Sequence, residues 1–216
     1  MGAVLAMRAF HPCLLSVVLL AGCGNDPDRS NPLADLVQSP AEASAVASDP
    51  NAMARAGLSQ VGGPLMLAVL EDRGAVALLV PYGQNGAVTT WTTAEFQTVS
   101  LLGGRVVATR GLGDDLMSRT PLAPFGTMRS TMRLNTLNAA NEAVSLELEC
   151  RVQTGDTMPI ALASGQTLRA TGYAEKCTGP EGTVQNDFWM VGGVMRQTRQ
   201  WLGPEAGHLT LQVLRP

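Results

Sequence analysis

The stretch VSLELECRVQ, residues 144–153, decides the fold class, because apolar and polar residues alternate strictly along it. Successive side chains of a β-strand point to opposite faces of its sheet. One face of this segment is therefore apolar and includes Cys150, while the other face carries only polar side chains. The pattern predicts a strand of an antiparallel sheet with one buried face.

The chain from residue 58 onward repeats this organisation, with short apolar runs separated by Gly, Asn, Asp and Pro. The pairs Gly103-Gly104 and Gly192-Gly193 are typical of tight hairpin turns. Many strands joined by short turns predict an all-β fold, an antiparallel curved sheet closing into a barrel-like or sandwich domain. Besides 144–153, the predicted strands cover residues 65–70, 75–80, 88–92, 96–102, 105–109, 127–134, 168–176, 184–191, 195–201 and 209–214.

The first 23 residues have the organisation of a lipoprotein signal. Arg8 supplies a positive charge, and the apolar run at 14–20 is too short to span a bilayer as a helix. Leu-Ala-Gly-Cys at 20–23 is a lipobox, in which cleavage leaves Cys23 first in the mature chain and its thiol accepts a diacylglyceryl group. An ordinary secretory signal is the alternative, and it also predicts export.

Lipidation of Cys23 would fix the location of the protein. A diacylglyceryl group and an N-acyl chain together anchor a protein stably to a membrane, and we expect no other cofactor. Gly24 stands where an Asp would retain an enteric lipoprotein in the inner membrane. We therefore expect a lipid anchor in the outer membrane, with the protein facing the periplasm.

Three regions follow from this reading of the sequence. Residues 1–22 are the signal peptide, residues 23–57 are the lipidated N-terminus with a flexible, proline-punctuated tether, and residues 58–216 are a single β-rich domain. Within the tether, Asp49 could cap a helical turn that starts at Pro50.

Two cysteines, Cys150 and Cys177, remain once the signal is removed and Cys23 carries lipid. In an oxidising compartment such a pair usually forms a disulfide. The two have no C-x-x-C spacing, which favours a structural bond over a redox site.

Composition argues against several classes of function. The net charge of -3 gives no case for a nucleic-acid partner. His208 is the only histidine after the signal, and it follows a turn, so we expect neither a metal site nor a catalytic base. Asp114 and Asp115 could be a catalytic carboxylate pair, but adjacent carboxylates in a Gly-rich segment are more typical of a solvated turn. We therefore expect a protein that is not an enzyme.

Binding residues are sought among the few aromatic side chains. Trp189 and Trp201 lie on consecutive predicted strands, and Trp201 shares a strand face with Arg199. We take Trp201, Arg199 and Trp189 as candidates for a glycan-binding surface, with burial in the core as the alternative for both indoles. A further set of arginines could contact an acidic polysaccharide if clustered, although scattered outward positions are favoured. This set comprises Arg105, Arg110, Arg119, Arg129 and Arg133.

Four segments, at 104–112, 186–193, 196–204 and 211–216, resemble the group 4 capsule polysaccharide lipoprotein family, GfcB/YjbF. The resemblance implies an exported lipoprotein with a mostly antiparallel β domain that serves capsule or exopolysaccharide assembly or secretion. It implies polysaccharide export or assembly proteins as partners, with the polysaccharide itself as a further candidate, and it carries over no catalytic residue. Two other functions stay open. One is a carrier that holds lipid or glycan in a concave sheet, and the other is a polysaccharide-modifying hydrolase using Asp114 or a strand carboxylate.

Overall fold

The computed structural model describes residues 49–120, 129–138, 140 and 142–216. Within them it contains one α-helix, α2 (Pro50–Gln60), one 3-10 turn, η2 (Glu71–Arg73), and twelve strands. The strands are β1 (Leu65–Leu70), β2 (Ala75–Asn85), β3 (Val88–Thr92), β4 (Thr98–Leu102), β5 (Arg105–Arg110), β6 (Leu116–Thr120), β7 (Ser130–Leu137), β8 (Ala143–Ala161), β9 (Thr167–Gly179), β10 (Gly182–Val191), β11 (Val194–Gly203) and β12 (Gly207–Arg215).

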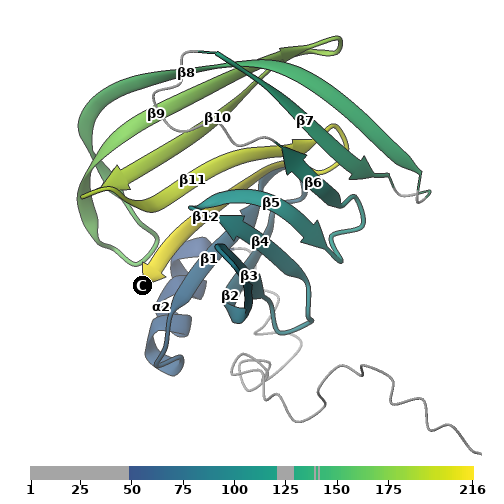
Figure 1. Ribbon diagram of the computed structural model, residues 1–216. Helices are drawn as coiled ribbons and strands as arrows, with labels where there is room; N and C mark the ends of the chain where they lie inside the picture. Colours follow the sequence, from purple (N-terminus) through teal and green to yellow (C-terminus); the bar gives the residue numbers. More distant parts are fainter. Residues whose placement is uncertain (1–48, 121–128, 139, 141) are drawn as a thin grey trace, which may run out of the picture. The chain divides into compact units, whose positions relative to one another are not determined.

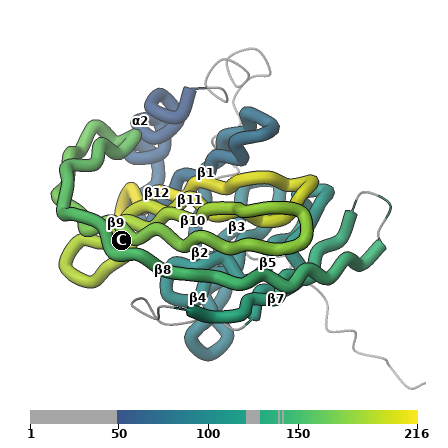
Figure 2. Tube along the Cα trace, turned by 90° about the horizontal axis from the view of Figure 1, so that it is seen from above, coloured from purple at the N-terminus to yellow at the C-terminus, as the bar shows by residue number. Residues whose placement is uncertain are grey.

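All twelve strands belong to one antiparallel sheet, in the order β5-β4-β3-β2-β1-β12-β11-β10-β9-β8-β7-β6. The two edge strands, β5 and β6, are consecutive in the chain and contact each other, so the sheet curls into a nearly closed barrel (Figures 1 and 2). The predicted all-β class is confirmed, and the single continuous sheet makes it barrel-like rather than a sandwich.

Alternation along the strands places the core. In β8, Leu148, Cys150 and Val152 are buried while the residues between them are exposed, as the sequence predicts. The main apolar cluster draws on the inward faces of strands from β1 to β12, including Leu79, Leu134 and Leu211 among its buried residues. The apolar faces of the strands therefore line the interior of the barrel.

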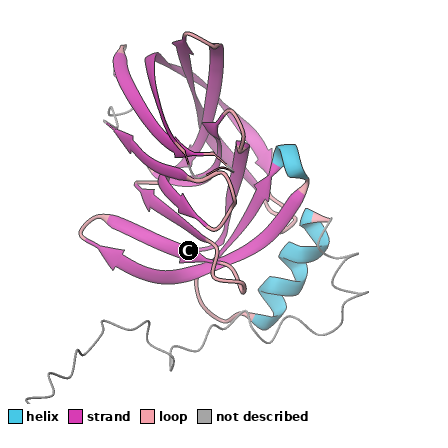
Figure 3. Ribbon diagram, turned by 90° about the vertical axis from the view of Figure 1, so that its right-hand side faces the viewer, coloured by secondary structure: helices cyan, strands magenta, loops and turns pink. Residues whose placement is uncertain are grey.

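The helix α2 lies against the outer face of the sheet (Figure 3), and a second apolar cluster fills the space between them. The helix begins after Asp49, whose Oδ1 accepts a hydrogen bond from the backbone N–H of Asn51 at 2.9 Å. Ala54 and Gly57 are buried, and a Cβ on Gly57 would lie only 2.5 Å from Cδ1 of Leu78, so glycine permits this close approach. The guanidinium of Arg215 donates to carbonyl oxygens at the end of the helix, including that of Leu58 at 3.0 Å.

The packing of α2 corrects the predicted domain boundary. The tether was expected to run to residue 57, but the helix from Pro50 already packs on the sheet, so the folded part begins earlier. Gly and Ala give the helix a weak apolar stripe, which explains why the segment is read as linker. The expected signal at 1–22 and the tether up to residue 48, including Cys23, lie outside the described residues.

Two further strand features differ from the sequence prediction. The short strand β6 was not predicted, because its five residues, LMSRT, carry Arg119 at an inward position. Strand β8 extends well beyond the alternating segment, to Ala161, through residues that are mostly exposed. Among the described residues, no helix is long and apolar enough to cross a membrane.

Candidate functional site

The disulfide expected from the sequence lies in the barrel wall. Cys150 of β8 and Cys177 of β9 are direct partners in the strand register, and their sulfur atoms are bonded at 2.08 Å. Both residues are fully buried within the main apolar cluster. A pair of this kind, without solvent access, is suited to holding two strands together rather than to exchange with an external thiol.

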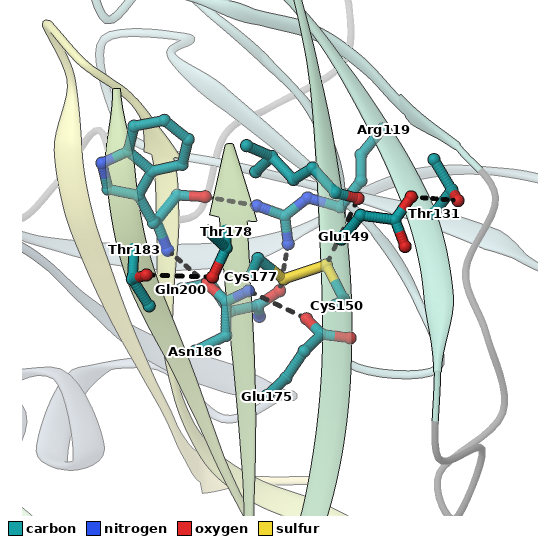
Figure 4. Close-up of a disulfide and its surroundings, with 12 residues drawn as sticks. Arg119, Thr131, Glu149, Cys150, Glu175, Cys177, Thr178, Thr183, Asn186 and Gln200 are labelled. Atoms are coloured by element: carbon teal, nitrogen blue, oxygen red, sulfur yellow. Dashed lines mark hydrogen bonds between the residues drawn. A yellow bond between two sulfur atoms is a disulfide. The ribbon is translucent and has the colours of Figure 1, made fainter. Parts of the chain in front are cut away.

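Polar side chains gather in the interior beside this disulfide (Figure 4). The most buried is Gln200 of β11, which is 0% exposed. Its Nε2 donates to the carbonyl of Gly104 at 3.0 Å, and its Oε1 accepts from the backbone N–H of Val106 at 2.9 Å. Strand β5 is an edge strand, and the side-chain amide has the donor and acceptor of a peptide group. Gln200 therefore satisfies backbone groups that a further strand would otherwise bind.

Arg119 attaches the other edge strand, β6, to the same centre. Its Nη1 donates to Oε1 of Gln200 at 3.0 Å, and its Nη2 donates to the backbone carbonyl of Trp201. The backbone N–H of Trp201 donates to Oδ1 of Asn186 at 2.7 Å, because the β10–β11 ladder ends at Arg199. Side chains thus replace backbone pairing on both sides of the gap in the barrel.

The interior also holds charge. Arg105 lies 3.5 Å from Glu175 and stacks over the Phe188 ring at 5.1 Å, and Glu175 accepts a hydrogen bond from Asn186 at 2.8 Å. Burial lowers the pKa of Arg105, and the charge of Glu175 opposes this. Burial likewise lowers the pKa of Arg119 to about 10, with Glu175 raising it and Arg105 lowering it further. The buried side chains of Arg105, Arg119, Glu175 and Asn186 therefore help to hold the barrel closed.

On the outer face, Arg199 is fixed by an acidic partner. Its Nε lies 3.0 and 2.9 Å from the two carboxylate oxygens of Glu71, which also accepts from the hydroxyl of Thr210 at 2.8 Å. Burial by itself raises the pKa of Glu71, but the hydrogen bonds from Arg199 and Thr210 and the charges of Arg199 and His208 outweigh it. The pKa of Glu71 is therefore lowered.

The two candidate tryptophans lie in different surroundings. Trp201 is half-buried on the outer face, opposite His208 of β12 in the register, and part of its surface packs against the main cluster. Trp189 is half-buried against a separate outer cluster that includes Ile160 and Leu162. Trp201 and Arg199 thus share a face, as predicted, while Trp189 contributes to packing at the far end of β8 and β9.

The carboxylates considered for catalysis have structural partners. Asp115 accepts hydrogen bonds from the backbone N–H of Gly111 at 2.8 Å and the hydroxyl of Thr109 at 2.9 Å, and so shapes the turn between β5 and β6. Asp114 forms an ion pair with Arg73. His208 contacts the carbonyl of Gln185 at 3.1 Å. Within the described part of the chain, no group of His, Cys, Asp and Glu side chains could hold a metal ion.

The five arginines grouped in the sequence do not form one surface. Arg105 and Arg119 point into the barrel, where they are 5% and 2% exposed, and Arg133 pairs with Glu147 at 3.0 Å. Arg110 contacts the carbonyl of Thr109 in its own strand. The hypothesis of scattered outward positions is therefore wrong for two of them, because inward strand positions are not always apolar.

A small pocket opens at the end of the barrel near η2. Its volume is about 130 Å³, and its apolar wall comes from residues such as Ala68, Ala77 and Leu79, with Arg73 and Gln97 at the rim. A cavity of about 150 Å³ holds a ligand the size of benzene. A second pocket, of about 180 Å³, lies between Thr136, Leu202 and Pro204. Each of these two openings is too small to enclose a glycan or a lipid chain.

Residues 33–214 match the family described as group 4 capsule polysaccharide lipoprotein, gfcB, YjbF. The chain belongs to this family. Among solved structures, the chain is similar to the hypothetical lipoprotein YmcC from Escherichia coli (K12), with a TM-score of 0.65 and 19% identity over 87% of this chain and 97% of that one. Among curated protein sequences, none matches significantly. The family confirms the resemblance seen in the sequence, and YmcC has the same fold.

Sequence reasoning missed the interior polar centre. Arg105, Glu175, Asn186 and Gln200 come from four strands spread along the chain. The sequence analysis considers Arg105 only as one of a set of arginines, and it assigns no role to the other three. One signal was available: Gln200 shares strand parity with Leu202 and Thr198, not with Trp201. A glutamine on the apolar side of a strand indicates a buried hydrogen-bonding role.

Proposed function

We propose that this protein is a membrane-anchored periplasmic lipoprotein that serves capsule or exopolysaccharide assembly or secretion by binding, without catalysis. Membership of the capsule polysaccharide lipoprotein family over residues 33–214 carries the proposal. The lipobox ending at Cys23 supports the anchor and Gly24 supports the outer membrane, with the folded domain in the periplasm.

The surroundings of the polar groups also support a binding role. The buried groups, such as Gln200 and Arg119, bind each other and the backbone. Asp114 and Asp115 bind an arginine and a turn. Each is already engaged in holding the fold. We therefore assign a polysaccharide or an export protein to the outer face of the sheet, where Trp201 lies next to Arg199 and its partner Glu71.

The test uses the full-length lipoprotein, purified in detergent, and the polysaccharide produced by its own cells. We expect retention of the polysaccharide on immobilised protein, with an unchanged chain-length distribution and no new reducing ends after prolonged incubation. Shortened chains would refute the non-catalytic role and support the hydrolase. If the polysaccharide is not retained, the protein would have to act by binding other proteins. Cross-linking followed by pull-down would then identify the export proteins that it binds.

A further inference from the structure

We propose that the outer face of β8 and β9 binds an acidic polysaccharide through a row of three basic side chains, Arg129, Arg151 and Lys176, called here the basic row. This inference rests on the proposed function and names the chemistry of the polymer that the protein contacts.

Strand register brings the basic row together. Arg151 of β8 and Lys176 of β9 are direct partners. Arg129 precedes Ser130, whose partner is Cys150, so the same register continued by one residue places Arg129 beside Arg151. Neighbouring strands lie about 4.8 Å apart, so the row spans roughly 10 Å across the sheet.

The side chains of the row point away from the core. Cys150 and Cys177, the neighbours of Arg151 and Lys176, are 1% and 0% exposed and face the interior. Because strand side chains alternate, the basic residues face outward, and all three are exposed. The disulfide directly beneath the row holds its two strands in fixed register.

No acid among the described residues forms an ion pair with the row. Like charges directly opposite each other on a sheet are destabilising, and Arg151 and Lys176 are such a pair. Among the described residues, none of the three has an ion-pair partner, whereas Arg133 and Glu147 on the same sheet pair at 3.0 Å. Two further acids share the outer face: Glu149 of β8 accepts a hydrogen bond from the hydroxyl of Thr131 at 3.0 Å, and Asp187 of β10 accepts one from the side-chain amide of Gln185 at 2.6 Å. The arrangement favours an anionic partner supplied from outside.

Polar and aromatic groups continue the row. Gln185 of β10 is the register partner of Lys176. The carbonyl of Gln185 contacts the ring of His208, which is opposite Trp201. Amide and indole groups next to the charges suit a polymer that offers hydroxyl groups and ring faces as well as carboxylates.

A polysaccharide fits this surface better than a membrane does. Proteins that lie on anionic bilayers combine basic side chains with exposed apolar ones that enter the lipid. Among residues 49–120, 129–138, 140 and 142–216, the exposed large apolar side chains are Phe96, Val144, Met158 and Val194, and none belongs to the row or to its continuation toward Trp201. The row is therefore assigned to a chain of acidic sugars.

The experiment measures binding of the full-length lipoprotein, in detergent, to polygalacturonate, with dextran as the neutral polymer. The variant is the pair Arg151→Gln and Lys176→Gln, and Arg133→Gln is the matched control with an exposed arginine off the row. We expect binding to polygalacturonate that weakens with salt, little binding to dextran, and affinity lowered roughly tenfold or more in the paired variant only. Lys176→Glu should abolish binding without lowering Tm, since it places opposite charges face to face.

Three results would overturn the inference. They are equal affinity of the paired variant and the native protein, no polygalacturonate binding by the native protein, and loss in the paired variant of binding to phosphatidylglycerol vesicles but not to polygalacturonate. The proposed function is tested separately, by whether the protein retains the polysaccharide of its own cells. Either proposal can therefore fail while the other one stands.

Discussion

Replacing Gln200 by leucine tests whether the interior polar centre holds the barrel closed. The change keeps a side chain of similar size at a site that is 0% exposed, but removes four hydrogen bonds. Their partners are the Gly104 carbonyl, the Val106 N–H, the Arg119 guanidinium and the Thr198 hydroxyl, at 2.9 to 3.0 Å. Leaving a buried polar group unsatisfied costs about 1–3 kcal/mol, and breaking a buried charged network costs about 3–5 kcal/mol.

We therefore expect Gln200→Leu to lower the free energy of unfolding by roughly 3–5 kcal/mol, or Tm by roughly 10 °C for a domain of this size. Urea unfolding followed by tryptophan fluorescence measures the change. Gln197→Leu is the matched control, because Gln197 lies on the outer face of the same strand with a single bond, from Gln212 at 3.1 Å. A loss below about 1 kcal/mol for Gln200→Leu, or equal losses for the two variants, would refute the role given to Gln200.

Four further predictions concern the anchor, the disulfide and the outer face. Cys23→Ser should remove the lipid and move the protein to the soluble periplasmic fraction. A variant that stays with the membranes and keeps the added mass of the lipid would contradict the lipobox. Non-reducing mass mapping should find Cys150 linked to Cys177, and Cys150→Ala should lower stability by about 3–4 kcal/mol, the loop-closure value for a separation of 27 residues, while free thiols would sink this prediction. The lowered pKa of Glu71 means that its contribution to stability is full above the unfolded pKa of about 4.3 and is lost as pH falls through the folded value. Glu71→Gln should therefore flatten the acid side of the stability curve, and an identical curve would be evidence against the Arg199 pair. Trp201→Ala should reduce polysaccharide output with only a modest fall in Tm, because part of the indole packs against the main cluster, whereas a loss of roughly 3–5 kcal/mol would show that the indole is core packing.

The fold could be predicted from the sequence where one physical pattern dominates. Alternation at 144–153 and the Gly-Gly turns at 103–104 and 192–193 identify strands and hairpins, because they depend only on neighbouring residues. The start of the domain at Pro50 could not be predicted, because Ala54 and Gly57 gain their packing only from strands that follow in the chain.

The sites show the same limit. Trp201 and Arg199 share a face because their spacing within one strand fixes it. The basic row joins residues from three segments, and the interior centre joins Gln200 to β5 and β6 across the barrel. Such contacts depend on register and closure of the sheet, which no local pattern contains. Grouping arginines by closeness in sequence therefore combined interior and exterior residues, while Arg151 and Lys176 were passed over.

The central claim is that this lipoprotein helps polysaccharide reach the cell surface without changing its chemistry. The most direct measurement is the amount and chain length of polysaccharide, at the surface and in the periplasm, in cells lacking the gene and in cells where it is restored. We predict that surface polysaccharide falls in the deletion strain, that chain length is unchanged, and that the restored gene returns the surface amount. Equal surface polysaccharide with and without the gene would contradict the account.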